Sequence, residues 1–166
     1  MRLTRGGDYA VRIMVHLASA PWGALIPRRQ IQEEQDVPPA HLGKIIQTLG
    51  RAKLVLTFRG AGGGVRLAVR PEEVTLRRVI EAVEGPIYLN RCLVAPGACP
   101  RDWFCTVHPV WHRIQEALMR ELDGVTMAAL AVPEGSARPV RLSVAGAKAG
   151  PRHAALPIRL DGKKAG

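Results

Sequence analysis

The chain has 166 residues, enough for one domain with a hydrophobic core plus an arm or tail, and too few for two full domains. Lysine and arginine outnumber aspartate and glutamate by 24 to 14, and the net charge of +10 favours a polyanionic partner, either nucleic acid or an acidic membrane surface. No apolar run approaches the roughly 20 residues that span a bilayer, and Arg12 and His16 interrupt the stretch where a signal peptide would need its apolar core. We therefore expect a cytoplasmic protein with no membrane partner.

Three helices are predicted in the first third of the chain. Apolar residues at helical spacing predict the first over residues 8–20, with Asp8 favourably placed at its positive N-terminal end. A short second helix is predicted over residues 28–35, after a stretch rich in proline and glycine. The third is predicted over residues 39–51, because Pro39 is tolerated in a first turn and a stripe of leucine and isoleucine follows it.

A β-hairpin is predicted next. Residues 54–58 and 65–69 are apolar and β-branched, and the glycine-rich run 59–64 separates them. A strand follows these glycines where a phosphate-binding loop would need a helix, so a phosphate loop is excluded. Taken alone, the glycines fit a merely flexible turn equally well, but the neighbouring Arg59 and Arg66 favour a DNA-binding wing.

The later part of the chain predicts further helices. Thr75 is a good N-cap for a helix over residues 76–84, and a longer helix is predicted over residues 109–123, with Gly124 placed to end it. The apolar stripe of this long helix is broader than a monomer of this size needs, so we expect a homodimer. Thr126 can cap a short final turn.

These elements predict a mainly α fold with a small β-hairpin wing: a winged helix-turn-helix followed by a long C-terminal dimerisation helix. We expect a DNA-binding domain over residues 1–85 and a metal-binding loop with the dimerisation helix over residues 86–131. Residues 132–166 are expected to form a disordered basic tail, with seven basic and two acidic residues. The tail's excess of five is half of the net charge of +10, so DNA binding by the folded part depends on where its charges lie.

A winged helix uses its third helix to read DNA. In an isolated helix the polar face of residues 39–51 would suggest only a solvated surface, but its position after a short helix and a tight turn makes it a recognition helix. Lys44, Arg51 and Lys53 are expected to contact phosphates. The residues expected to contact DNA are Arg28, Pro39, Ala40, His41, Lys44 and Arg51 from the helices and Arg59, Gly60, Gly62 and Gly63 from the hairpin.

All three cysteines of the chain lie in one short segment, at Cys92, Cys99 and Cys105. A single free cysteine is most often a small buried hydrophobe, but three that are spaced by seven and six positions among proline and glycine cannot share one regular core face. In a reducing compartment such a group favours metal ligation over disulfides. The spacing is looser than that of most zinc sites and suits a larger inorganic cluster.

A fourth ligand is needed, and two residues qualify. His108 follows the third cysteine by three positions; its alternative role is to cap the helix predicted from Pro109. Asp8 offers a carboxylate, which is an unusual and labile ligand for iron. Its alternative role, a charge at a helix N-terminus, is the simpler interpretation from sequence physics alone.

The chain resembles the Rrf-two family of bacterial winged-helix regulators over about residues 1–131, nearly without gaps. The matching motifs are Met1 to Thr4, Asp8 to Arg12, Leu54 and Val55 with Arg59 to Val65, Val79 to Gly85, and Cys92, Cys99 and Cys105 with His108 and Trp111. The resemblance implies a homodimer that binds palindromic promoter DNA, with the three cysteines holding an iron-sulfur cluster beside a long dimerisation helix.

The family completes its cluster in two ways. In one pattern a histidine shortly after the third cysteine completes a 2Fe-2S cluster, and His108 occupies that place. In the other, an aspartate in the first helix reaches across from the other subunit to complete a 4Fe-4S cluster, and Asp8 occupies that place. The chain has both residues, and its interval from Cys92 to Cys99 departs slightly from well-known members, so the cluster type stays open.

The sequence thus predicts a regulator, most simply a repressor, whose operator affinity is switched by an iron-sulfur cluster that senses redox state, nitric oxide or iron-sulfur supply. No paired acid and base and no nucleotide fingerprint suggests an enzyme. One alternative keeps the fold but uses the cysteines as a cluster-free thiol-redox or zinc site. A less favoured alternative is an iron-sulfur electron carrier.

Overall fold

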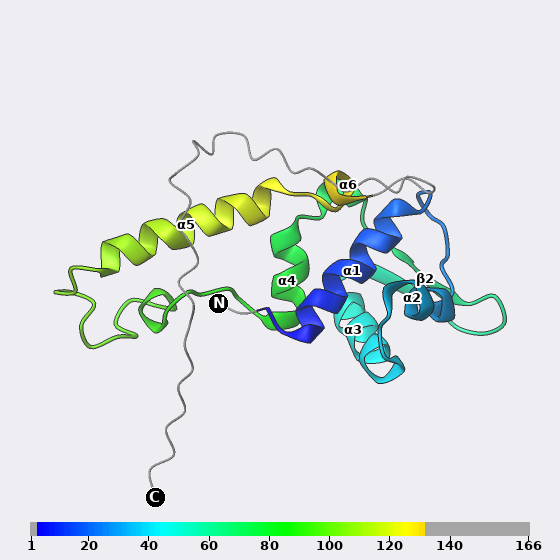
Figure 1. Cartoon of the computed structure of the whole chain (residues 1–166), viewed down its shortest axis with the longest axis horizontal. Coiled ribbons are helices and arrows are strands. Elements are labelled where there is room, and N and C mark those ends of the chain that lie inside the picture. Colours follow the sequence, from blue (N-terminus) through cyan, green and yellow to red (C-terminus); the bar gives the residue numbers. More distant parts are fainter. Residues whose placement is uncertain (1–2, 132–166) are drawn as a thin grey trace, which may run out of the picture. The chain divides into compact units, whose positions relative to one another are not determined.

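The computed structural model describes residues 3–131, and the tail expected over residues 132–166 lies outside this part (Figure 1). Among the described residues, no helix combines the length and apolar character that crossing a membrane requires. The elements in chain order are α1 (Arg5–Ser19), α2 (Arg28–Gln35), α3 (Pro39–Arg51), β1 (Val55–Phe58), β2 (Gly64–Leu67), η1 (Pro71–Glu73), α4 (Leu76–Glu84), η2 (Arg91–Leu93), α5 (His108–Gly124) and α6 (Met127–Leu130). The mainly α fold with one antiparallel hairpin is confirmed.

Helix α1 begins three residues earlier than its apolar pattern predicts. The Thr4 hydroxyl accepts a hydrogen bond from the Gly7 backbone N–H at 3.3 Å, as an N-cap does. The Glu84 carboxylate at the end of α4 accepts from the same N–H at 3.1 Å and also from the Thr4 backbone N–H. These acceptors satisfy the N–H groups of Thr4 and Gly7 at the helix start and help to offset the poor helix propensity of Gly6 and Gly7.

The helix-turn-helix matches its predicted bounds at both α2 and α3. Asp36 ends α2 in the left-handed conformation, with φ of 49°, and Val37 is buried in the turn. Pro39 occupies the first turn of α3 as expected. The predicted apolar stripe of α3 is buried against α1, and the buried residues of α3 are Leu42, Ile45, Ile46 and Leu49.

The hairpin pairs Val55 with Leu67 and Phe58 with Gly64. It is shorter than predicted at its C-terminal end, because β2 runs from Gly64 to Leu67 and the chain then turns into η1. Ile26, between α1 and α2, adds a bridge to Val65 through two reciprocal backbone hydrogen bonds of 2.9 and 2.8 Å. A side chain at Gly64 would place its Cβ 2.5 Å from the Ile26 carbonyl oxygen, so the close approach requires glycine.

The C-terminal helices return the chain to the winged helix. Thr75 and Thr126 cap α4 and α6 as predicted, and a short bridge pairs the two threonines. Helix α6 contacts α1, and α5 contacts α4 and η2 (Figure 1). In the described part of the chain, α5 carries no buried side chain, although its apolar stripe is long. It begins at His108 itself, one residue before the predicted start.

Candidate metal centre and DNA-binding surface

The cysteine segment leaves α4, passes through η2 and enters α5, and Gln115 fastens its first part. The Leu89 backbone N–H donates to Gln115 Oε1 at 3.0 Å, and Gln115 Nε2 donates to the Ile87 carbonyl oxygen at 2.7 Å. The Gln115 side chain is half-buried, and both of its polar atoms form hydrogen bonds with the backbone. These bonds replace the hydrogen bonds to water that the Leu89 N–H and the Ile87 carbonyl lose on burial. Gln115 therefore ties the backbone just before Cys92 to helix α5.

One compact group of metal-ligating side chains lies in this segment. Cys92, Asp102 and His108 each offer one ligand atom, and these atoms lie within 4.8 Å of one another. Asp102 Oδ2 accepts a hydrogen bond from the Gly97 backbone N–H at 3.1 Å, which ties the carboxylate to the loop. Its other oxygen, Oδ1, lies 3.4 Å from His108 Nδ1. Both of these atoms are shielded from solvent and have no hydrogen-bond partner.

Asp102 was missed by the sequence analysis. An acidic residue three positions before Cys105 was visible in the sequence, but only the turn between Gly97 and Asp102 brings its carboxylate to Cys92. Burial raises the pKa of the Cys92 thiol, and the charges of Asp102, Cys99 and Cys105 raise it further. A cation bound among these donors would offset the repulsion, so the donor set suits a metal.

The other two cysteines are near but separate. Cys99 and Cys105 are half-buried, free thiols whose charges reach Cys92, yet among the described residues neither joins the compact group. An open hollow of about 460 Å³ lies beside Cys92, Asp102 and His108, and His112 on the next turn of α5 also lines it. Space next to the Cys92 thiol is therefore available for an inorganic group.

The structure places Asp8 apart from this group. Its carboxylate lies on the exposed side of α1, with 58% of the side chain accessible, and pairs with Arg12 at 3.2 Å. Among the described residues of one chain, Asp8 contributes no ligand atom to the group around Cys92. Of the two candidate fourth ligands, His108 is the one that this chain brings to a cysteine by itself.

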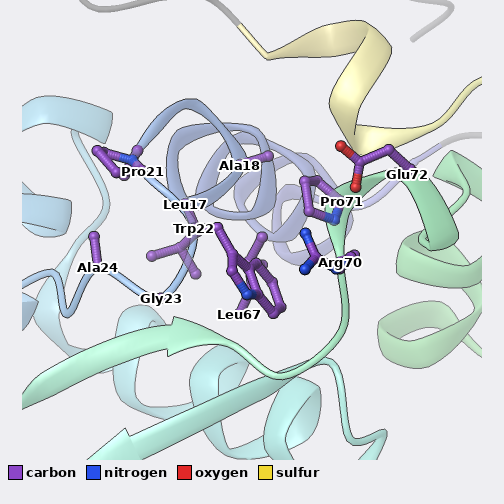
Figure 2. Close-up of a pocket in the computed structure, with 11 residues that line it drawn as sticks. Leu17, Ala18, Pro21, Trp22, Gly23, Ala24, Leu67, Arg70, Pro71 and Glu72 are labelled. Carbon is purple, nitrogen blue, oxygen red and sulfur yellow. The ribbon is translucent and has the colours of Figure 1, made fainter.

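A second hollow lies at the base of the hairpin, between the end of α1 and the chain before η1. The Arg70 guanidinium lies 5.2 Å from the ring centre of Trp22, and Figure 2 shows these two side chains next to each other. The residues that line it include no thiol and no imidazole. It therefore offers no thiolate or imidazole ligand, and the group of three metal-ligating side chains found among the described residues lies in the cysteine segment.

The predicted DNA-contacting residues on α2, α3 and the hairpin are exposed, except for the half-buried Gly63. Within residues 3–131, none of the cations Arg28, Lys44, Arg51 and Arg59 forms an ion pair, so their charges are free for phosphates. His41 is exposed at the first turn of α3 and packs against Tyr9 of α1. Gly60 and Gly62 have φ of 93° and 80°, which a tight hairpin tip requires.

Comparison with known proteins identifies the family. Residues 3–133 match the family Rrf2 (Rrf-two), described as an iron-dependent transcriptional regulator. The chain belongs to the Rrf2 family. The family resemblance of the sequence motifs is thereby confirmed.

Named Rrf2 relatives cover most of the chain. The HTH-type transcriptional regulator IscR of Aliivibrio salmonicida is 32% identical over 132 residues, which are 80% of this chain and 78% of that protein. The HTH-type transcriptional regulator NsrR of Geobacillus kaustophilus is 32% identical over 139 residues, or 83% of this chain and 95% of that protein. The solved structure of CymR, the global cysteine regulator of B. subtilis, is 27% identical and covers 79% of this chain and 96% of its own, with a TM-score of 0.65.

These likenesses define the broad role of the chain. It is an Rrf2-family transcriptional regulator of the helix-turn-helix type, with DNA as its partner, and α1 to α3 with the β1–β2 hairpin form its winged helix. The relatives are named as regulators and not as enzymes.

Proposed function

We propose that this Rrf2 protein is a cytoplasmic, homodimeric repressor whose affinity for a palindromic operator is switched by an iron-sulfur cluster on Cys92, Cys99 and Cys105. The observation that carries the proposal is the gathering of all three cysteines between α4 and α5, with His108 at the first position of α5, in a family described as iron-dependent. His108 and Asp8 of the partner subunit are the two candidate fourth ligands.

The residues present fit such a cluster. Three thiols, a nearby imidazole and an adjoining hollow supply the soft donors and the space. When bound, the cluster would supply iron that reacts with oxidants or nitric oxide. The chain's own contribution is positional: Gln115 holds the start of the segment, and His108 stands at the first position of α5, so ligation would join the segment to that helix.

DNA binding would use α3 in the major groove. The N-terminal residues Pro39, Ala40 and His41 are exposed and would meet base edges, while Arg28, Lys44 and Arg51 would contact phosphates. The hairpin tip, with Arg59, Gly60, Gly62 and Gly63, would approach the neighbouring backbone or minor groove.

The exposed apolar face of α5 supports a homodimer. Val110 and Ile114 lie one turn apart on this helix and are 39% and 44% exposed. A second copy of the same helix would bury this stripe, as isologous dimers do. Two copies of α3 would then be presented to two half-sites, which is the reason to expect a palindromic operator.

The test is spectroscopy of protein isolated without oxygen, beside Asp8→Ala and His108→Ala variants. We expect a coloured protein containing iron and sulfide, and we expect only one of the two variants to change the visible and electron paramagnetic resonance spectra. Gel shifts with excess competitor DNA should then show that operator affinity differs between cluster-bound and cluster-free protein. A colourless, iron-free protein after reconstitution would remove the cluster from the proposal.

A cluster-free thiol sensor is the second candidate function. It is favoured by the three free, half-buried thiols and by the similarity to a protein named as a cysteine regulator. Mass spectrometry after mild oxidation separates the two functions: this candidate requires a defined cysteine modification that changes operator binding in protein that contains no iron. Operator-specific binding in either case excludes an electron carrier.

A further inference from the structure

The compact group of Cys92, Asp102 and His108 has a geometry suited to a single ion. Metal–ligand bonds in zinc sites are about 2.0–2.3 Å long, which places neighbouring donor atoms of a tetrahedral site roughly 3.5 Å apart. The donors here lie within 4.8 Å of one another, and Asp102 Oδ1 and His108 Nδ1 are already 3.4 Å apart. Side-chain movements of about 1 Å would bring all three to one ion.

The close approach of Asp102 and His108 leaves one polar atom of each side chain without a hydrogen-bond partner. Although Oδ1 and Nδ1 are close, they make no hydrogen bond to each other, and each is hidden from solvent without any other partner. Buried polar atoms of this kind normally have a partner, and an ion that both atoms ligate would provide it. Asp102 is also held by the Gly97 backbone N–H, so its carboxylate is already oriented toward the group.

We propose that the cluster-free protein binds one divalent transition-metal ion, with Zn²⁺ as the best chemical match, on Cys92, Asp102 and His108. One thiolate, one carboxylate and one imidazole form a mixed set that zinc accepts, and three protein ligands leave its fourth position open to water. The proposed cluster needs Cys99 and Cys105, whereas this ion does not. Because both would use Cys92, the ion and the cluster would exclude each other, but the ion does not depend on the cluster's existence.

The test uses the full chain, reduced and freed of metal, titrated with Co²⁺ as a spectroscopic substitute for zinc. We expect a thiolate-to-cobalt charge-transfer band that saturates at one equivalent and is abolished by one equivalent of Zn²⁺. Cys92→Ala should abolish the band. His108→Ala and Asp102→Asn should weaken Co²⁺ binding at least ten-fold, with far-UV circular dichroism confirming that both variants are folded.

Three matched variants act as controls. Cys99→Ala and Cys105→Ala remove the other thiols, and His112→Ala removes an imidazole that lines the same hollow but pairs with Glu116. All three should keep the band and bind Co²⁺ within two-fold of the parent protein. A band that survives in Cys92→Ala, disappears in Cys99→Ala or Cys105→Ala, or is as tight in Asp102→Asn as in the parent overturns the proposal. A different result would overturn the iron-sulfur proposal: protein isolated without oxygen that contains no iron and no sulfide.

Discussion

Tyr9 of α1 packs edge to face against His41 of α3, with the two ring centres 5.7 Å apart. Arg12 lies over the same tyrosine ring at 5.0 Å and pairs with Asp8. A series of contacts therefore runs from Asp8, a candidate cluster ligand, to the first turn of the proposed recognition helix.

Removing the Tyr9 ring should weaken operator binding without unfolding the protein. An aromatic pair of this kind contributes about 0.5–1.5 kcal/mol, so Tyr9→Leu should raise the dissociation constant for the operator about two- to ten-fold. Fluorescence anisotropy with labelled operator DNA measures this. Tyr88→Leu, at an exposed residue far along the chain from α3, should leave the constant unchanged. Equal affinity of Tyr9→Leu and the parent would show that the ring does not position His41.

Replacing Gln115 should loosen the segment that leads to Cys92. Gln115→Ala removes two hydrogen bonds and leaves the Leu89 N–H and the Ile87 carbonyl without their partners, at a local cost of about 1–2 kcal/mol. Amide hydrogen exchange around residues 87–92 should accelerate about five- to thirty-fold, as measured by mass spectrometry. Gln30→Ala, which affects only an exposed contact to Glu34, is the control. Unchanged exchange would mean that the segment is held by other contacts.

Arg59 should contribute one phosphate contact to DNA binding. Each such contact steepens the dependence of log affinity on log salt by about one, so Arg59→Ala should flatten that slope by about one per subunit, or about two for the proposed homodimer, across different DNA sequences. A salt titration of operator and random DNA tests this. The matched substitution Arg120→Ala, on the exposed side of α5, should leave the slope as it is. A loss confined to operator DNA would instead assign Arg59 to base reading.

The core beneath the recognition helix should be sensitive to truncation. Ile46 is 1% exposed, and Ile46→Ala should lower the free energy of unfolding by about 2–5 kcal/mol through lost burial and a cavity. Urea denaturation at one fixed protein concentration measures the change, since a dimer's stability depends on concentration. Its exposed neighbour provides the comparison: Gln47→Ala should alter stability by less than about 0.5 kcal/mol.

The bounds of α2, α3 and α4 could be predicted from the sequence because local signals agree there. Pro39 starts α3, Thr75 caps α4, and the apolar stripes of both helices have helical spacing. The start of α1 could not be predicted, because Gly6 and Gly7 have low helix propensity. Glu84, far along the chain, supplies a hydrogen-bond acceptor for the Gly7 N–H. The hairpin was expected, whereas its bridge to Ile26 depends on packing between distant segments.

By itself, the sequence determined the fold class, the family and the residue types of the candidate sites, because helical spacing, caps and the cysteine segment are local properties. Only the tertiary structure decided which donors meet. It brings Asp102 to Cys92 and His108 and leaves Asp8 of the same chain outside that group, paired with Arg12. The physical reason is that a loop of turns has no fixed period, so hydrogen bonds such as that from the Gly97 backbone N–H to the Asp102 carboxylate set where its side chains point.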